Sequence, residues 1–341
     1  MNRRYFFALI GSGAALLLLF TGIFLVGSLG VALESEEPVL VEVRSGEGLN
    51  QFLRRVEKEG LVKQTGWIRL LAIVGGDSRS IKAGEYAFKG SVSFNEFIDT
   101  LVSGKARHIA LTIPEGWSLK EIAKQIEEKE LGSPEEFLSL TMNQEFIAKL
   151  ELPFSKLRTL EGLIFPETYF FNRGLPMEKI ISSLVREIRT TVYQELEKSA
   201  GKIGMTPYQV MVLASVIEKE TGLASERRTI SAVFHNRLKS GMRLDSDPTV
   251  IYGIKDFNGN LTRKDLRTYT EYNTYKIYGL PPTPIASPGL DAIRAAMDPE
   301  PVKYLFFVGK GDGSHFFSKD LKTHNRAVWR YQKLPARKKR S

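Results

Sequence analysis

A segment near the start of the chain recurs 70 residues later without a gap, and this repeat limits the folds that the surrounding sequence can adopt. Residues 41–57 (VEVRSGEGLNQFLRRVE) align with residues 111–127 (LTIPEGWSLKEIAKQIE). Each copy begins with alternating apolar and polar residues, which is typical of a strand, and then passes through a glycine, Gly46 or Gly116. The apolar residues that follow recur at i, i+3 and i+7, as on one face of a helix. The repeat therefore predicts two strand–turn–helix units.

The first of these units opens a small α/β module that we expect to span residues 38–108. Between the two copies, the sequence predicts a further strand over 83–88 and a helix over 93–103, with Ser93 as its N-cap and Glu96 three residues on. A strand, a tight turn and a helix of this kind resemble the LysM-type module, which binds polymers of N-acetylglucosamine. The resemblance implies glycan binding. A generic strand–helix unit that only packs a small core is the alternative.

The N-terminal sequence has the pattern of a membrane anchor. Residues 5–33 contain no charged residue, and about 20 apolar residues are enough to cross a bilayer as a helix. Two arginines precede this run and three glutamates follow it, so we expect residues 1–4 in the cytoplasm and the rest of the chain outside. The sequence thus predicts a transmembrane helix over 5–33, an acidic linker over 34–37 and single-pass localisation to the cell inner (cytoplasmic) membrane. A signal peptide cleaved near residue 32 is the alternative.

Charge and composition exclude several classes of function. The chain carries 48 Lys and Arg against 39 Asp and Glu, a net charge of +9, which alone would suggest a nucleic-acid partner. Six of these positive charges lie at the chain ends, at positions 3–4 and 337–340. Because an exported chain does not meet nucleic acid, we expect no such partner. With no cysteine in the chain, disulfide scaffolds, thiolate zinc sites and cysteine nucleophiles are excluded.

From residue 109 to residue 332 the pattern predicts one larger, mixed α+β domain, followed by a basic tail over 333–341. Helical periodicity covers 118–130, 134–149, 176–199, 206–221, 225–240, 287–297 and 320–332. Short strands are expected at 109–113 and 304–308, the latter pairing with 315–317 across a Gly-Asp-Gly turn. The segment 241–286 is rich in turn residues and tyrosine, and a long loop region of this kind is more often functional than a passive connector.

The helix predicted over 206–221 carries the strongest chemical signal. Thr206 and Gln209 form a capping box at its start, and the helix is apolar almost all round, which indicates burial. Its last turn nevertheless contains Glu218 and Glu220. Burial and the negative end of the helix dipole both raise the pKa of a carboxyl group, which suits a general acid at neutral pH. Helical geometry barely separates Glu220 from Glu218, and an exposed, unremarkable helix end is the alternative.

The motifs around this helix are recognisable as a set. They are ASVIEKET (214–221), FHNRL (234–238), DPTVIYG (247–253), YNTY (272–275), GLPP (279–282) and IASPG (285–289), with EGLIFPETY (161–169) and KAGEY (82–86) upstream. In this order they resemble the endolytic murein transglycosylases, the MltG or YceG-like family. The resemblance covers nearly the whole chain and includes the anchor-first layout. It implies lysozyme-like helical elements, the glycan strands of peptidoglycan as substrate, peptidoglycan synthases as candidate partners, and no cofactor or metal.

The resemblance also implies a reaction and a catalytic residue. The bond cleaved would be the β-1,4 bond between N-acetylmuramic acid and N-acetylglucosamine in nascent strands, leaving a 1,6-anhydro end. One glutamate serves as acid and then base while the sugar's own C6 hydroxyl attacks, so the second carboxylate of hydrolytic glycosidases is not needed. Lysozyme-like transglycosylases carry this acid immediately before a Ser or Thr. Glu220-Thr221 matches that pattern and Glu218-Lys219 does not; we therefore expect Glu220 to be catalytic, supported by Glu218 and Thr221.

Six further residues are candidates for binding substrate or supporting Glu220. Asn236 and Arg237 could hold Glu220 or a muramoyl carboxylate, or form a surface pair, and Asp247 is expected in a turn or helix cap at the edge of the cleft. The remaining three can stack on sugars or hydrogen-bond to them, or simply pack: Tyr252, Asn273 and Tyr275.

Other chemistries find little support in the sequence. The four histidines lack the spacing of metal ligands, and Ser215 lacks the context of a serine nucleophile. The three tryptophans, Trp67, Trp117 and Trp329, are expected to pack in the core rather than to form sugar platforms. A non-catalytic, wall-binding scaffold and a hydrolytic muramidase are the alternative functions.

Overall fold

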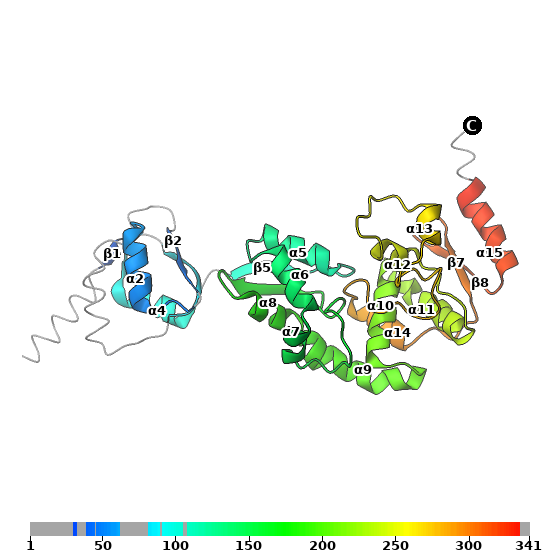
Figure 1. Cartoon of the computed structure of the whole chain (residues 1–341), viewed down its shortest axis with the longest axis horizontal. Helices are drawn as coiled ribbons and strands as arrows, with labels where there is room; N and C mark the ends of the chain where they lie inside the picture. Colours follow the sequence, from blue (N-terminus) through cyan, green and yellow to red (C-terminus); the bar gives the residue numbers. More distant parts are fainter. Residues whose placement is uncertain are drawn as a thin grey trace, which may run out of the picture. The chain divides into compact units, whose positions relative to one another are not determined.

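The computed structural model describes residues 30–32, 39–44, 46–61, 81–88, 91–104 and 108–334. They form two compact units. The first comprises the described residues up to Ala110 together with Lys129–Leu131 and Phe170–Pro176, and the second comprises the remainder. Figure 1 shows the order of the elements along the chain.

The first unit consists of short antiparallel strand pairs and two helices around one apolar core. Its strands are β1 (Gly30–Ala32), β2 (Val39–Val43), β3 (Gly84–Phe88) and β4 (Ser91–Ser93), and its helices are α2 (Leu49–Lys58) and α4 (Phe94–Ser103). Strand β2 pairs with β3, and β1 pairs with β4. The predicted N-cap of α4 is confirmed, because Ser93 Oγ accepts a hydrogen bond from the backbone N–H of Glu96 at 3.2 Å.

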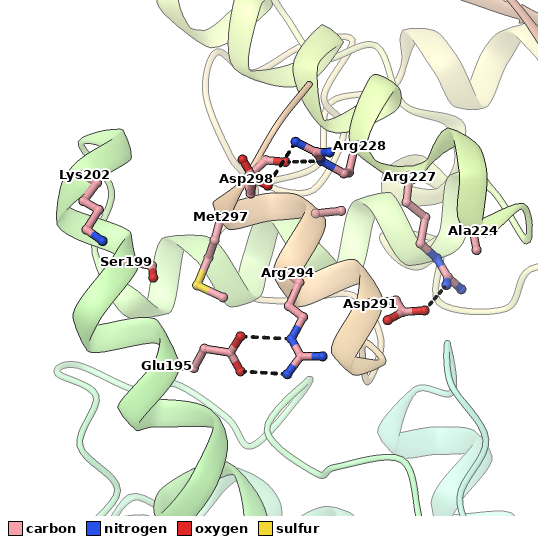
Figure 2. A pocket seen from close by; sticks show the side chains of 11 residues that line it. Glu195, Ser199, Lys202, Ala224, Arg227, Arg228, Asp291, Arg294, Met297 and Asp298 are labelled. Atoms are coloured by element: carbon pink, nitrogen blue, oxygen red, sulfur yellow. Dashed lines mark hydrogen bonds and ion pairs between the residues drawn. The ribbon is translucent and has the colours of Figure 1, made fainter. Parts of the chain in front are cut away.

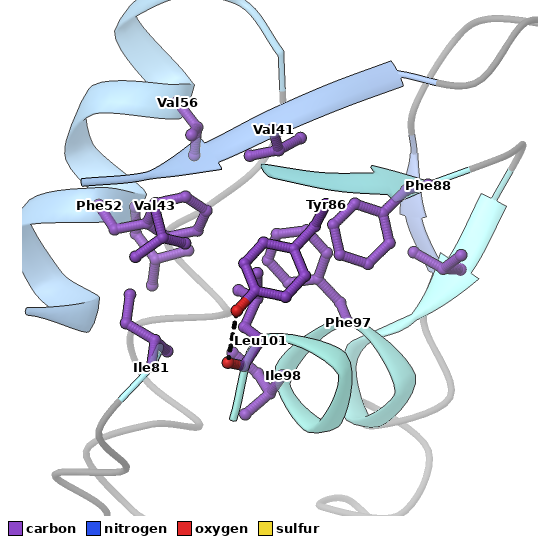
Figure 3. Close-up of a cluster of buried hydrophobic side chains, with 12 residues drawn as sticks. Val41, Val43, Phe52, Val56, Ile81, Tyr86, Phe88, Phe97, Ile98 and Leu101 are labelled. Atoms are coloured by element: carbon purple, nitrogen blue, oxygen red, sulfur yellow. Dashed lines mark hydrogen bonds between the residues drawn. The ribbon is translucent and has the colours of Figure 1, made fainter. Parts of the chain in front are cut away.

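Aromatic side chains fill this core, as Figure 3 shows. The rings of Phe88 and Phe97 lie 4.7 Å apart between centroids, and Phe52 lies on the other side of Phe97. The fully buried Tyr86 places its hydroxyl against the backbone, where it donates to the carbonyl oxygens of Lys82 and Leu101. This buried aromatic ring therefore keeps a hydrogen-bond partner, as burial of its polar group requires.

The two copies of the repeat fold alike. The second copy forms β5 (His108–Thr112) and α5 (Leu119–Glu128), matching β2 and α2 of the first. Gly46 and Gly116 occupy equivalent turns with the same φ of +78°, a left-handed conformation that glycine adopts without steric cost. The helix residues that follow at equivalent positions are fully buried in both copies: Phe52 and Val56, Ile122 and Ile126. The predicted strand–turn–helix units are confirmed.

Most of the predicted membrane anchor lies outside the described residues. Of the segment 5–33, the structure describes only Gly30–Ala32, which form strand β1 rather than helix. Within the described ranges, no helix combines the length and apolar character needed to cross a membrane. The predicted linker over 34–37 and the tail beyond residue 334 are also outside those ranges.

The second unit combines many helices with short strand pairs, so the predicted mixed α+β class is confirmed. After α5 its helices are α6 (Pro134–Met142), α7 (Gln144–Lys149), α8 (Met177–Leu184), α9 (Tyr193–Ser199), α10 (Pro207–Glu220), α11 (Ala224–Lys239), α12 (Asp247–Tyr252), α13 (Arg263–Arg267), α14 (Leu290–Met297) and α15 (Leu321–Val328). Short π or 3₁₀ turns are η1 (Ile188–Val192), η2 (Ala200–Ile203) and η3 (Trp329–Lys333). Strand β7 (Phe306–Gly309) pairs antiparallel with β8 (His315–Ser318). Strand β5 pairs with β6 (Thr168–Asn172), and each of these two strands has residues in both units.

Two segments differ from the expected elements. The helix expected over 134–149 is divided at Asn143, whose side chain accepts a hydrogen bond from Phe146 N and so begins α7. The segment 241–286, expected to be a loop, contains the short helices α12 and α13. Each has six residues or fewer, which is too short for an apolar periodicity to be visible in the sequence.

Helix α10 lies at the centre of the second unit, in contact with α9, α11, α12 and α14. Its predicted capping box is present: Thr206 Oγ1 accepts from Gln209 N, and the Gln209 side chain accepts from Thr206 N. Every residue from Val210 to Ile217 is buried. A rigid, buried helix therefore fixes the positions of the acidic residues in its last turn.

Candidate active site

Glu220, the last residue of α10, lies at a cavity of about 510 Å³. Its Oε1 accepts a hydrogen bond from the hydroxyl of Ser246 at 2.5 Å. Loss of solvent raises the pKa of Glu220 to about 7; the Asp247 carboxylate adds to this rise, whereas Ser246 and Arg237 oppose it. A carboxyl group that titrates near neutral pH can both donate and accept a proton.

Ser246 is held rigidly against Glu220. The residue is buried; its backbone N–H donates to Thr274 Oγ1 at 2.9 Å, and its carbonyl oxygen accepts from Thr249 Oγ1 at 2.7 Å. Sequence reasoning did not identify Ser246 as a site residue. The available signal was its place between two aspartates, two residues before a proline, which does not reveal the contact with Glu220.

Arg237 lines the same cavity and fixes the segment that carries Ser246. Its buried guanidinium donates to the carbonyl oxygens of Leu305 at 2.7 Å and Leu244 at 2.9 Å, and pairs with Asp245 Oδ2 at 3.2 Å. The neighbouring Asn236 donates instead to the carbonyl oxygens of Val302 and Tyr304, so its side chain supports the backbone that leads to β7.

Asp247 and Tyr275 complete this side of the cavity. The Tyr275 hydroxyl donates to Asp247 Oδ1 at 2.7 Å, and Asp247 is the first residue of α12, at the surface. Of the residues selected from the sequence, the structure thus brings four together around one cavity: Glu220, Arg237, Asp247 and Tyr275.

The other five selected residues, Asn236 and Glu218 among them, do not belong to the lining of this cavity. Tyr252 donates its hydroxyl to Glu161 Oε2 at 2.9 Å. Asn273 is fully buried, where it donates to the carbonyl oxygen of Thr268 and so closes the end of α13. Thr221 Oγ1 accepts from the backbone N–H of Leu223 at 3.0 Å, which shapes the turn after α10.

Glu218 takes part in a separate polar network. Its Oε1 accepts from Arg227 Nη2 at 3.2 Å, and its Oε2 accepts from the backbone N–H of Gly289 at 3.0 Å. Arg227 also pairs with Glu115 at 3.5 Å and with Asp291 at 3.4 Å. Burial raises the pKa of Glu218. The carboxylate therefore ties the end of α10 to α11 and to the start of α14.

A second cavity, of about 640 Å³, lies along Arg227. Figure 2 shows three ion pairs in its walls: Arg227 with Asp291, Arg228 with Asp298, and Arg294 with Glu195. These pairs join α9, α11 and α14, so the charged side chains serve the packing of the helices around α10.

The second copy of the repeat contributes a loop to the end of α10. Lys219 Nζ donates to the carbonyl oxygen of Gly116 at 3.0 Å. The backbone N–H of Gly116 donates to Ser287 O at 2.8 Å, and Ser287 N donates to Trp117 O at 2.7 Å. The sequence analysis did not foresee that this turn contacts the helix of the glutamates.

Glu161 is a second carboxyl group with a strongly perturbed pKa. Burial raises the pKa of Glu161 to about 7, although it accepts hydrogen bonds from Tyr252 and from the backbone N–H of Leu119 at 3.1 Å. It lies in the motif EGLIFPETY, but no local pattern distinguishes it from an exposed glutamate. In the described part of the chain, no group of three or more acidic or histidine side chains is arranged to hold a metal ion.

The far wall of the Glu220 cavity comes from the C-terminal elements, whose part in the site the sequence analysis did not anticipate. Strands β7 and β8 and helix α15 supply Phe306, Phe307, His315, Leu321, His324 and Asn325, among others. His315 Nδ1 pairs with Glu226 Oε2 at 2.7 Å, which joins β8 to α11. The cavity therefore combines one poised carboxyl group with aromatic rings and polar side chains.

Comparison with known proteins places this arrangement in a family. The model of the YceG-like family matches residues 41–330. The chain is 31% identical over 331 residues to a protein of Bacillus subtilis (strain 168) named endolytic murein transglycosylase, covering 92% of this chain and 91% of that protein. A protein of the same name from Streptococcus pneumoniae (strain ATCC BAA-255 / R6) is 27% identical over 86% of this chain, which spans 58% of its length.

A solved structure agrees with this family. The crystal structure of a yceG-like protein from Listeria monocytogenes superposes with a TM-score of 0.60 at 29% identity, covering 86% of this chain and 99% of that one. Since the family model and the B. subtilis relative each span most of the sequence, the chain belongs to the YceG-like family.

Proposed function

We propose that the protein is an endolytic murein transglycosylase, which cleaves the glycan strands of peptidoglycan with Glu220 as its catalytic acid and base. The B. subtilis relative that carries this name is similar along 92% of the chain. The structural observation that carries the proposal is the carboxyl of Glu220, held at the end of a buried helix in a cavity with its pKa raised to about 7.

The proposed reaction needs only this carboxyl group and the substrate. Protonated Glu220 gives its proton to the glycosidic oxygen between N-acetylmuramic acid and N-acetylglucosamine, and the bond from that oxygen to the anomeric carbon breaks. The C6 hydroxyl of the same muramoyl sugar then attacks the anomeric carbon and returns its proton to Glu220, which leaves a 1,6-anhydro end. An intramolecular nucleophile has an effective molarity of up to about 10⁵–10⁸ M, so no water is required.

The neighbours of Glu220 would tune and position it. Ser246 stabilises the carboxylate that forms once the proton has left, and Asp247 favours its reprotonation. Arg237 supports the segment of Ser246, and Tyr275 orients Asp247 through their 2.7 Å hydrogen bond. Glu218 and Thr221 would fix the end of α10. Asn236 and Asn273 would hold the surrounding backbone, and Tyr252 would hold Glu161.

A hydrolytic muramidase is the second candidate, because Asp247 lies at the same cavity as Glu220. Hydrolytic glycosidases use two carboxyl groups on either side of the scissile bond. The two candidates differ in the fate of water: hydrolysis adds its oxygen to the new reducing end, and the transglycosylase reaction adds none.

Digestion of purified peptidoglycan by the full-length protein in water enriched in ¹⁸O tests these alternatives. Mass spectrometry of the products should show 1,6-anhydro ends without ¹⁸O and no release by Glu220→Gln. Reducing ends that contain ¹⁸O would identify a hydrolase. If the folded protein binds peptidoglycan and releases nothing, it is a scaffold rather than an enzyme.

The proposed place of action is the outer face of the cytoplasmic membrane, with nascent glycan strands and their synthases as partners. Residues 5–29 carry no charge, and this run is longer than the stretch of about 20 residues that a helix needs to cross a bilayer. The pairing of Gly30–Ala32 with Ser91–Ser93 favours a retained anchor, because cleavage near residue 32 would remove strand β1 from the first unit. That unit is the candidate LysM-like glycan-binding module. Recovery of the uncleaved chain in salt-washed membranes would test the anchor.

A further inference from the structure

Trp329, expected in the core, is instead 50% exposed, so the prediction for this residue is wrong. It begins the turn η3 that continues α15. Leu321, two helical turns earlier, is 57% exposed, and Asn325 lies between them on the same face. With Lys322 and Arg326, these residues line a shallow hollow of about 760 Å³. Exposed apolar side chains gathered around a hollow are typical of binding surfaces.

This hollow adjoins the cavity that contains Glu220. Leu321 and Asn325 line both of them, so the two sites lie on neighbouring faces of helix α15 that meet at these residues. A polymer whose scissile bond lies at Glu220 has to leave the cavity on some side, and α15 borders one such exit. An exposed tryptophan therefore lies where a long, chain-like substrate would pass.

We propose that the Trp329 hollow is a distal glycan subsite, where the indole ring stacks on a sugar of the same strand whose bond lies at Glu220. The inference rests on the proposed function. The face of a pyranose ring that carries its C–H bonds is apolar and fits the flat indole, and the amide of Asn325 can hydrogen-bond to sugar hydroxyls.

The charges around the hollow fit the anionic character of peptidoglycan. Lys322 and Arg326 line it, and no acidic residue is among the described residues that do so. The stem peptides of muramic acid carry carboxyl groups, and the lactyl substituent carries one where the peptide has been removed; these cations would meet either. An anionic lipid surface would also attract them, but the lining residues shared with the Glu220 cavity, Leu321 and Asn325, favour the glycan strand.

Binding by the full-length Glu220→Gln protein in mild detergent separates these outcomes. The probes are long glycan strands freed of peptides, a single disaccharide, and glycerol 1-phosphate, the soluble head group of phosphatidylglycerol. We expect Trp329→Ala to weaken binding of long strands about tenfold and to leave disaccharide binding unchanged, whereas Trp329→Phe retains most of the affinity. Tyr269→Ala removes another exposed aromatic ring, 72% accessible, and is the matched control.

With Glu220 intact, Trp329→Ala should raise KM for long strands about tenfold while kcat stays unchanged. Equal strand binding by Trp329→Ala and the parent, at a temperature where both are folded, would overturn the subsite. A loss of binding to glycerol 1-phosphate alone would overturn it too. If the parent protein cleaves nothing but its strand binding still depends on Trp329, the proposed function fails and the subsite stands.

Discussion

The hydroxyl of Ser246 donates a hydrogen bond to Oε1 of Glu220 at 2.5 Å, across 26 residues of sequence. Burial and the Asp247 carboxylate raise the pKa of Glu220, and the Ser246 hydrogen bond lowers it, because this bond is stronger to the ionised form. The proton affinity of Glu220 is therefore a balance between desolvation and one directed contact. That balance can be changed by a single substitution.

We expect Ser246→Ala to raise the pKa of Glu220 by about one unit, the value of one hydrogen bond to a charged group. An enzyme that needs protonated Glu220 loses activity as the pH rises through this pKa, so the alkaline limb of kcat/KM should move to higher pH. The fold should survive, because Thr249 and Thr274 bind the backbone of residue 246. Ser225→Ala, at an exposed position, is the control. An alkaline limb that stays at the same pH or moves to lower pH in Ser246→Ala would contradict this role of Ser246.

Substitution of the two glutamates at the end of α10 should give opposite results. Glu220→Gln is expected to lower kcat by about 10²–10⁴, the range of general acid–base catalysis. The variant should be no less stable than the parent at pH 8. At that pH Glu220 is mostly ionised, and burial disfavours the ionised carboxyl group that the substitution removes.

Glu218→Gln should instead destabilise the protein by about 1–3 kcal/mol, because Arg227 loses its buried anionic partner. Its activity is expected to stay within about tenfold of the parent, because the substitution shifts the end of α10 but leaves the carboxyl group of Glu220 in place. Thermal unfolding and product analysis of the two variants provide the measurements. An inactive but folded Glu218→Gln protein beside an active Glu220→Gln protein would reverse the assignment.

The helix of these glutamates could be predicted because its signals are local. Thr206, Gln209 and Gly222 define its ends, and its apolar run predicts its burial. The same is true of the repeat, where the turn glycines and the apolar spacing lie within 17 residues. These features depend on neighbours along the chain, which the sequence shows directly.

The partners of the site residues could not be predicted, since they come from distant segments. Ser246 reaches Glu220 through the packing of α12 against α10, and Glu161 contacts a residue 91 positions away. Trp329 shows a different limit. An apolar stripe on α15 has the same sequence pattern whether it faces a core or a hollow, and only the packing of β7 and β8 decides between them.

Glu161 should make the stability of the protein depend on pH. Its pKa is about 7 in the folded state and near 4.5 in the unfolded chain, so the folded state binds the proton more tightly. The free energy of unfolding should therefore fall as the pH rises from about 4.5 to 7, by up to about 3 kcal/mol. Glu161→Gln should remove much of this fall. Denaturant unfolding between pH 4.5 and 8 measures it, with the exposed Glu127→Gln as control; identical pH profiles for the two variants would refute the role of Glu161.

The repeat supplies its own control for the loop on α10. Gly46 and Gly116 have the same φ of +78°, and a methyl group added at either would meet no atom closer than 3.7 Å. Gly46→Ala and Gly116→Ala should thus carry a similar backbone strain, about 1 kcal/mol, from the left-handed conformation alone.

Their effects on activity should differ, because Gly116 alone of the two bonds to Lys219 and Ser287 beside the glutamates. We expect Gly116→Ala to lower kcat/KM several-fold, through displacement of the end of α10 by strain in this loop, and Gly46→Ala to leave cleavage of peptidoglycan unchanged. Both variants should be assayed where circular dichroism shows them folded. Equal losses of activity would mean that the strain acts through general instability, and no loss in either would mean that the loop yields without moving Glu220.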